Sequence, residues 1–174
     1  MSDQPLWRPS PERAAATQIH AFRAEVERRF SESLPDYASL HAWSIAERAD
    51  FWSTVWDFCG VLGERGERAV EGLERMPGAR WFPDARLNFA ENLLRRRDGT
   101  PALIARDERG ARRTLTWAAL QDEVSRVAQA LRALGVRPGD RVAGYLPNSV
   151  EAIVAMLAAA SLGAIWSSCS PDFG

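Results

Sequence analysis

The stretch RVAGYLPNSVEAIVAMLAAASLGAIWSS, from Arg141 to Ser168, decides the fold class. Residues 141–146 have the apolar character of a buried strand, and residues 164–168 repeat it. Between them we expect an Ala-rich helix that Asn148 caps, with Glu151 three residues further on. Strand, helix and strand of these lengths predict a βαβ unit with two parallel strands and a right-handed crossover. The predicted fold class is therefore α/β.

The residues that follow the second strand form the candidate site. Ligands of open α/β sheets bind beyond the carboxyl ends of the strands, and residues 167–174 lie at such an end. No His lies nearby in the sequence to activate a Ser or Cys, so no catalytic residue is predicted here. A plain turn of small residues is the commoner alternative. The candidate binding residues are Ser167, Ser168, Cys169, Ser170 and Asp172.

Residues 99–140 predict the elements that precede this unit. Two β-type runs flank the turn DERGA at residues 107–111, which indicates a hairpin. The helix after Thr116 has a long apolar stripe and should end at Gly135. The stripe consists of Leu120, Val124, Val127, Leu131 and Leu134. Residues 99–174 are thus expected to be the start of one domain.

Residues 39–98 read as a helical region. Ser44 and Glu47 fit a capping box, which would open a helix with an apolar stripe at residues 51–58. Trp52 and Trp56 on that helix could stack on a ligand, but burial of the helix on two sides is the favoured interpretation. The next segment, Trp81–Phe82, precedes a proline and should be extended.

A second, shorter helix is expected at the end of this region. Asn88 would cap it through Leu94, with Glu91 completing a capping box. The three arginines 95–97 suit the negative end of the helix dipole, and a phosphate-binding cluster is the alternative. Residues 1–38 predict an arm with one amphipathic helix, which begins at Ser10 and stops by Pro35.

Composition excludes several classes of function. The 174 residues carry 22 basic and 23 acidic side chains, a balance that indicates neither a nucleic-acid partner nor a membrane surface. All the basic residues are Arg, so the chain offers no Lys for phosphate binding or acyl transfer. Its two Cys and two His have no metal-ligand spacing, and no metal ligand is predicted. A reducing, cytoplasmic location is expected.

Three separated motifs carry a family resemblance. FWSTVWDFCG (51–60), ARWFPDARLNFAENLL (79–94) and the whole of residues 113–174 resemble the start of the short-chain acyl-CoA synthetases of the adenylate-forming superfamily. The similarity runs from about Leu40 to Gly174. The motifs RLNFAENLL and WSSCSPDFG are most similar to the branch that activates acetoacetate, and acetate- or propionate-activating relatives are the alternative.

The resemblance implies a two-step ligase reaction. Acetoacetate would attack the α-phosphate of ATP to give acetoacetyl-AMP and pyrophosphate, and the thiol of CoA would then displace AMP. Magnesium would accompany ATP, and the loop Ser167–Asp172 would border the CoA channel. The resemblance also implies a place in lipid metabolism and ketone-body use.

The chain lacks the motifs that carry this chemistry in the family. It has no Ser/Thr/Gly-rich phosphate loop ending in Lys, no adenine- and magnesium-binding region and no acyl-transfer Lys. We therefore expect a helical segment followed by a truncated first part of the adenylate-forming large domain. Such a chain alone should be inactive and should bind ATP, CoA and Mg²⁺ poorly. A stand-alone binding or assembly module is the alternative from a different class.

Overall fold

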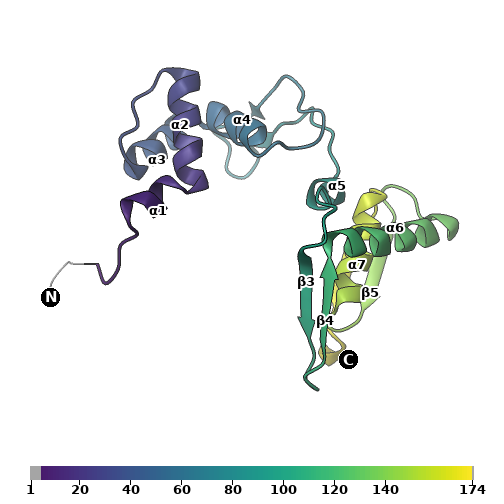
Figure 1. Cartoon of the computed structure of the whole chain (residues 1–174). Coiled ribbons are helices and arrows are strands. Elements are labelled where there is room, and N and C mark those ends of the chain that lie inside the picture. The colour runs from purple at the N-terminus through teal and green to yellow at the C-terminus, as the bar shows by residue number, and fades with distance from the viewer. Residues whose placement is uncertain (1–4, 174) are drawn as a thin grey trace. The chain divides into compact units, whose positions relative to one another are not determined.

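The computed structural model describes residues 5–173, which form two compact units (Figure 1). Unit 1 comprises Met1–Val61 and Arg65–Ala85, and unit 2 comprises Leu62–Glu64 and Arg86–Gly174. The domain boundaries expected after residues 38 and 98 stay predictions. Gly174, the last residue of the predicted loop, lies outside the described residues.

Unit 1 begins with four helices: α1 (Pro11–Ala15), α2 (Gln18–Phe30), α3 (Tyr37–Ala46) and α4 (Arg48–Phe58). Ser10 caps α1 as predicted, because its side chain accepts from the backbone N–H of Arg13. The single helix expected in this region is wrong. Thr17 opens a second helix by accepting from the backbone N–H of His20 at 3.3 Å. The chain leaves α2 at Ser31, whose φ of 56° is left-handed.

The capping box predicted at Ser44 is also wrong. Ser44 lies inside α3, where its hydroxyl donates to the carbonyl of His41 at 2.8 Å. The box in the structure joins Asp36 and Ser39, each side chain accepting from the other residue's backbone N–H. The backbone hydrogen bond from Ser39 lowers the pKa of Asp36. A Ser with a Glu three residues later occurs inside helices as well as at their starts, so the pattern alone could not locate this boundary.

The core of unit 1 is aromatic. The ring of Phe22 on α2 meets those of Phe51 and Phe58 on α4 edge-on, at centroid distances of 5.7 and 5.3 Å. The apolar stripe predicted at residues 51–58 therefore packs against α2, while Ile19 of α2 is 51% exposed. The buried residues of this core are Phe22, Val26, Leu34, Leu40 and Trp43.

The opposite side of α4 meets a short antiparallel ribbon, β1 (Val70–Glu71) and β2 (Arg80–Trp81). Trp52 contacts Trp81 at 5.9 Å and Trp56 contacts Phe82 at 5.1 Å, between ring centroids. Both tryptophans thus contact protein rings, but Trp52 is 44% exposed, so the predicted burial of this helix on two sides is only partly confirmed. The extended conformation expected at Phe82 is wrong, because its φ is 42°.

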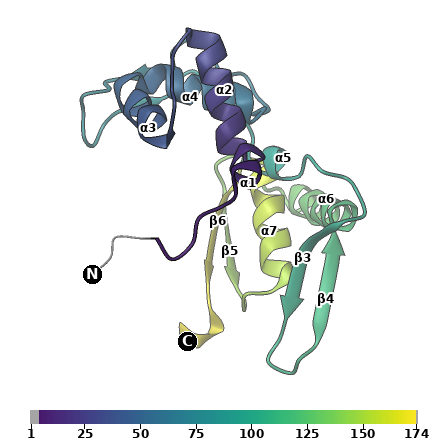
Figure 2. The same ribbon diagram turned by 60° about the vertical axis from the view of Figure 1, so that its left-hand side comes forward.

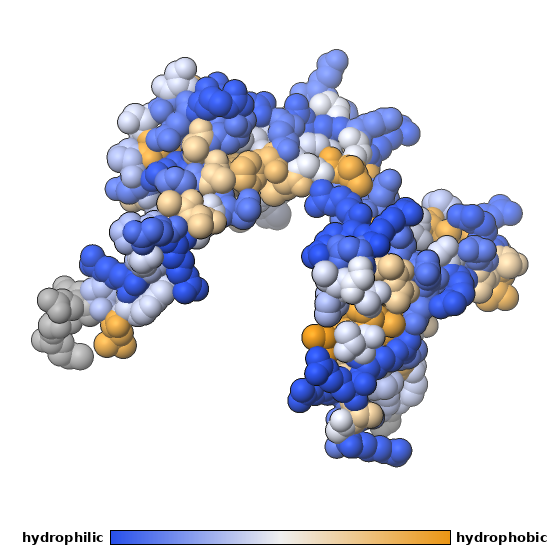
Figure 3. Space-filling view, in the orientation of Figure 1, coloured by the Kyte–Doolittle hydropathy of each residue, from blue (hydrophilic) through white to orange (hydrophobic). Residues whose placement is uncertain are grey.

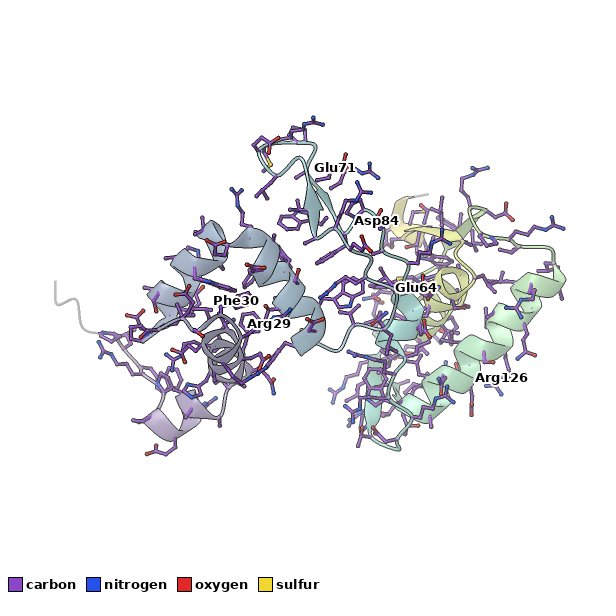
Figure 4. All side chains as sticks on the ribbon, turned by 90° about the horizontal axis from the view of Figure 1, so that it is seen from above. Arg29, Phe30, Glu64, Glu71, Asp84 and Arg126 are labelled. Carbon is purple, nitrogen blue, oxygen red and sulfur yellow. The ribbon has the colours of Figure 1, made fainter. Side chains whose placement is uncertain are left out.

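Charged pairs lie on the outside of unit 1. Arg68 bonds Asp84 at 2.6 Å and Glu71 at 3.4 Å, and Figure 4 labels both carboxylates near the ribbon. Arg29, which Figure 4 also labels, bonds Asp57 on α4 at 2.7 Å. These side chains are in good part solvated, so the pairs add little to the stability of the fold.

Unit 2 contains the predicted α/β elements. They are α5 (Phe89–Leu93), β3 (Pro101–Arg106), β4 (Arg112–Thr116), α6 (Trp117–Ala133), β5 (Arg141–Tyr145), α7 (Val150–Ser161), β6 (Ile165–Cys169) and the 3₁₀ turn η1 (Pro171–Phe173). The hairpin β3–β4 is confirmed. Strands β5 and β6 run parallel, with Arg141 opposite Ile165 and Tyr145 opposite Cys169 (Figure 2). The βαβ unit is therefore confirmed.

The core of unit 2 lies between α6, α7, α5 and the hairpin. Its buried residues are Ala90, Leu94, Leu115, Leu120, Val124, Val150, Val154, Leu157 and Ala158. The predicted stripe of α6 fails only at its end, because Leu134 is 81% exposed. Gly135, with φ 90°, ends the helix as expected, and the N–H of Val136 donates back to the carbonyl of Leu131 at 3.0 Å.

Two expectations for the βαβ unit are wrong. Ser149, not Asn148, is the N-cap of α7, and its side chain makes no capping hydrogen bond. Strands β5 and β6 are not buried: Tyr145 is 61% and Ile165 is 55% exposed. Within the described residues these two strands form a sheet of their own. Figure 3 shows hydrophobic residues exposed among hydrophilic ones in both units.

None of the helices within residues 5–173 combines the length and the apolar character needed to cross a bilayer.

Candidate functional site

Three of the five predicted site residues lie on a strand and not in a loop. Ser167, Ser168 and Cys169 form the second half of β6, where Ser168 pairs with Gly144 and Cys169 with Tyr145. Their backbone groups make ladder hydrogen bonds to β5, which extends the strand beyond the expected Ser168. Ser170 and Asp172 lie in the turn that follows. The structure therefore places all five at the carboxyl end of the parallel pair, as predicted.

The turn after β6 is held by local hydrogen bonds. The hydroxyl of Ser170 donates to Oδ2 of Asp172 at 2.8 Å and accepts from the backbone N–H of Asp172 at 3.3 Å. Tyr145, at the end of β5, donates its phenolic hydrogen to the carbonyl of Pro171 at 2.9 Å. Sequence analysis missed Tyr145, because nothing in a strand pattern says where a phenol finds its acceptor.

Two other segments meet this turn. Residues 147–149, which follow β5, and residues 106–109, at the tip of the hairpin, line the same open depression as residues 170–172. Its volume is about 630 Å³. The position of residues 147–149 could have been predicted from the sequence. Parallel strands end at one edge of a sheet, so the loop after β5 lies beside the loop after β6. The position of the hairpin tip beside this turn could not have been predicted, because it depends on tertiary packing.

An ion-pair cluster fixes the scaffold beside this depression. Arg113 of β4 bonds Glu123 of α6 at 2.7 Å and Glu151 of α7 at 2.5 Å. The pKa of Glu151 is lowered, mainly by a hydrogen bond from the Ser149 side chain and then by its own backbone N–H and by Arg113. Hydrogen bonding to Glu123 raises the pKa of Arg113. These ion pairs link the hairpin to both helices, and each of the three charges has its partner within the cluster.

The arginine cluster after α5 also has partners within the chain. Arg95 donates to the carbonyl of Asn92 at 3.0 Å. Arg96 pairs with Asp98 at 2.9 Å and lies over the ring of Trp117 at 5.3 Å. The bond from Arg95 to the last turn of α5 supports the helix-end interpretation for that residue, whereas Arg96 is paired with Asp98 beyond the helix.

The side chains at the ends of β5 and β6 are suited to binding a ligand and not to catalysing a reaction on it. The hydroxyl of Ser170 is oriented by a carboxylate two residues away, which is turn geometry, whereas a Ser or Cys nucleophile needs a base such as His. His20 and His41 belong to the helices of unit 1. Residues 5–173 contain no cluster of three His, Cys, Asp or Glu placed to hold a metal ion. The arrangement can form a polar wall for a ligand.

Two family models match the chain in succession. Residues 37–93 match the acetyl-coenzyme A synthetase N-terminus, and residues 89–174 match the AMP-binding enzymes. The join between the two matches falls in α5, the first helix of unit 2.

Individual relatives agree with these matches. The acetoacetyl-coenzyme A synthetase of Rhizobium meliloti is 51% identical over 99% of this chain and 27% of its own length. The malonamoyl-CoA synthetase of Penicillium aethiopicum is 45% identical over 97% of this chain and 24% of its own. The acetoacetyl-CoA synthetase of Rattus norvegicus is 43% identical over the whole chain and 26% of its own.

A solved structure agrees as well. The acetoacetyl-CoA synthetase from Streptomyces lividans superposes with a TM-score of 0.90 at 45% identity, covering 98% of this chain and 27% of the other. The chain spans about a quarter of the length of the relatives that it matches. It belongs to the AMP-binding enzyme family and corresponds to the N-terminal part of acetoacetyl-CoA synthetases.

Proposed function

We propose that the chain is the N-terminal part of an acetoacetate–CoA ligase, in which an acyl-adenylate forms from ATP and then passes its acyl group to CoA. The observation that carries the proposal is the agreement of fold and sequence with acetoacetyl-CoA synthetases along the entire chain. The role in lipid metabolism and ketone-body use, and the cytoplasmic location, belong to the same proposal.

The chain's own part in the reaction is to form one border of the CoA-binding region. Ser167, Ser168, Cys169, Ser170 and Asp172 supply hydroxyl, thiol and backbone groups at the open end of the parallel strands, where such folds bind their ligands. CoA supplies the thiol that accepts the acyl group. Mg²⁺ would accompany ATP by coordinating its phosphates.

The acid has a definable class. Acetoacetate and malonamate, the acids that two relatives are named for, share a carboxylate with a carbonyl group on its β-carbon. Relatives of both names match nearly the whole of this chain, at 51 and 45% identity. We therefore propose a short β-carbonyl carboxylate as the substrate, with acetoacetate first.

The test is a CoA-dependent AMP-formation assay on the native gene product, captured from source cells with an antibody against this chain. Acetoacetate, malonamate, acetate and propionate are compared at equal concentration. The β-carbonyl acids should react faster than acetate and propionate, and acetoacetate fastest. A preference for acetate or propionate would overturn the substrate class. No AMP formation with any acid would overturn the ligase function.

The 174-residue chain by itself is the matched comparison. It should give no acetoacetate-dependent exchange of pyrophosphate into ATP, because its sequence has no Ser/Thr/Gly-rich phosphate loop ending in Lys with which to hold the phosphates of ATP. Exchange by the purified chain would contradict this.

A further inference from the structure

The carboxyl ends of β5 and β6 are joined by one hydrogen bond between a side chain and the backbone. Tyr145 ends β5 and is 61% exposed, yet its hydroxyl reaches the carbonyl of Pro171 at 2.9 Å across the strand pair. Because Tyr145 pairs with Cys169 in the ladder, its ring stands beside the last residue of β6 and its hydroxyl reaches two residues further.

The turn that receives this bond is otherwise held only from within, as far as residues 5–173 show. Ser170 and Asp172 bond each other, which shapes the turn but does not attach it to the sheet. The backbone N–H of Leu146 donates to the carbonyl of Cys169 at 3.3 Å, the last backbone link between the two segments. Beyond that point, Tyr145 is what anchors residues 170–172 to β5.

We propose that Tyr145 is a positioning residue for the CoA half of the reaction: its hydroxyl holds the Ser170–Asp172 turn in place as a wall of the CoA channel. The inference rests on the proposed function, because it needs CoA to pass this turn. It adds to that function a residue that acts through the turn and not on the reacting atoms.

The two half-reactions separate this role from general stability. Adenylate formation needs no CoA, so a turn that only borders CoA should not affect it. Loss of one partly exposed hydrogen bond changes an equilibrium by about two- to tenfold. Tyr145→Phe keeps the ring and removes only the hydroxyl, so it should raise KM for CoA by about that factor.

The experiment uses the full-length enzyme with Tyr145→Phe, and Tyr37→Phe as the matched control. Tyr37 is the other tyrosine of the chain, is similarly exposed at 68%, and lies on α3 in unit 1. KM for CoA should rise only in Tyr145→Phe, and pyrophosphate exchange without CoA should match wild type in both variants.

A second variant tests the hydrogen bond within the turn itself. Asp172→Ala removes the acceptor of the Ser170 hydroxyl and should raise KM for CoA in the same selective way. An unchanged KM for CoA in Tyr145→Phe, or an equal loss in both half-reactions, would overturn the inference. An inactive wild-type enzyme would instead overturn the proposed function, so the two failures are distinguishable.

Discussion

At the scale of single residues, the carboxyl group of Asp98 has a strongly lowered pKa. The side chain of Thr100 donates to it, Arg96 pairs with it, and the backbone N–H of Thr100 adds a bond at 2.9 Å. Together they lower the pKa of Asp98 from 3.8 to about 2, the hydroxyl of Thr100 being the largest cause. A carboxylate bonded this way favours the folded state only while it is ionised.

We predict that Thr100→Val raises the pKa of Asp98 toward its ordinary value. The substitution removes the hydroxyl donor but leaves the hydrogen bonds from Arg96 and from the backbone N–H of residue 100. Titration of the carboxyl carbon by NMR measures it. In the wild type the stabilising effect of Asp98 should be complete above pH 3.8 and lost as the pH falls through about 2. Thr114→Val on β4 is the control and should leave Asp98 unchanged.

Gly144 is required by close approach and not by its backbone angle. A Cβ built at Gly144 would first meet Cδ2 of Leu146, and it would lie 2.6 Å from Cη2 of Trp166, nearer than carbon atoms can pack. We predict that Gly144→Ala lowers the free energy of unfolding by about 1–3 kcal/mol, because the side chains of Leu146 and Trp166 both have to move. Gly99→Ala, where a Cβ would meet nothing within 4 Å, is the control in the same thermal unfolding assay. Equal stability of the two variants would contradict this.

At the scale of elements, one side chain caps α5 and also links it by hydrogen bonds to the end of α7. Oδ1 of Asn88 caps α5 by accepting from the backbone N–H of Glu91 at 3.1 Å. Its Nδ2 donates to the carbonyl of Ala160 at 3.0 Å and to that of Ser161 at 3.3 Å, at the end of α7. The same residue therefore starts one helix and satisfies the end of another.

We predict that Asn88→Ala lowers the free energy of unfolding by about 1–3 kcal/mol, since both the cap and the link to α7 are lost. Asn88→Asp should cost less, because the cap acceptor remains. Asn148→Ala is the informative comparison: the sequence pattern made Asn148 a cap, but the structure places Ser149 there, so this change should be near neutral. Denaturant unfolding measures all three, and a loss at Asn148 equal to that at Asn88 would argue against the structure.

At the scale of the whole molecule, the parallel sheet has open strand edges and exposed apolar side chains. Both β5 and β6 are edge strands within the described residues, and Ile165 on β6 is 55% exposed. Unpaired strand edges with apolar side chains template association between chains.

We therefore predict that the 174-residue chain self-associates in a concentration-dependent manner, and that Ile165→Lys weakens the association. Sedimentation equilibrium measures it. Ile19→Lys is the matched control, since Ile19 is 51% exposed but lies on a helix of unit 1. If Ile19→Lys weakened association as much as Ile165→Lys, general surface apolarity and not the sheet edge would be responsible.

Local patterns in the sequence determined the elements of unit 2. The apolar period of α6, the left-handed glycine at its end, the turn chemistry of the hairpin and the strand–helix–strand order each act over a few residues, so each is readable without a structure. They also placed the candidate site, because the carboxyl ends of parallel strands must share one edge.

Tertiary structure decided what no local pattern encodes. Ser44 lies inside α3 and α4 begins only after Glu47, while Ser149 and not Asn148 precedes α7, so a capping pattern alone does not locate the start of a helix. Whether β5 and β6 are buried depends on which neighbours cover them, and the bond from Tyr145 to Pro171 depends on strand register across 26 residues. Sequence determined which segments form because propensity is local; structure decided which segments meet because contacts between distant residues are cooperative.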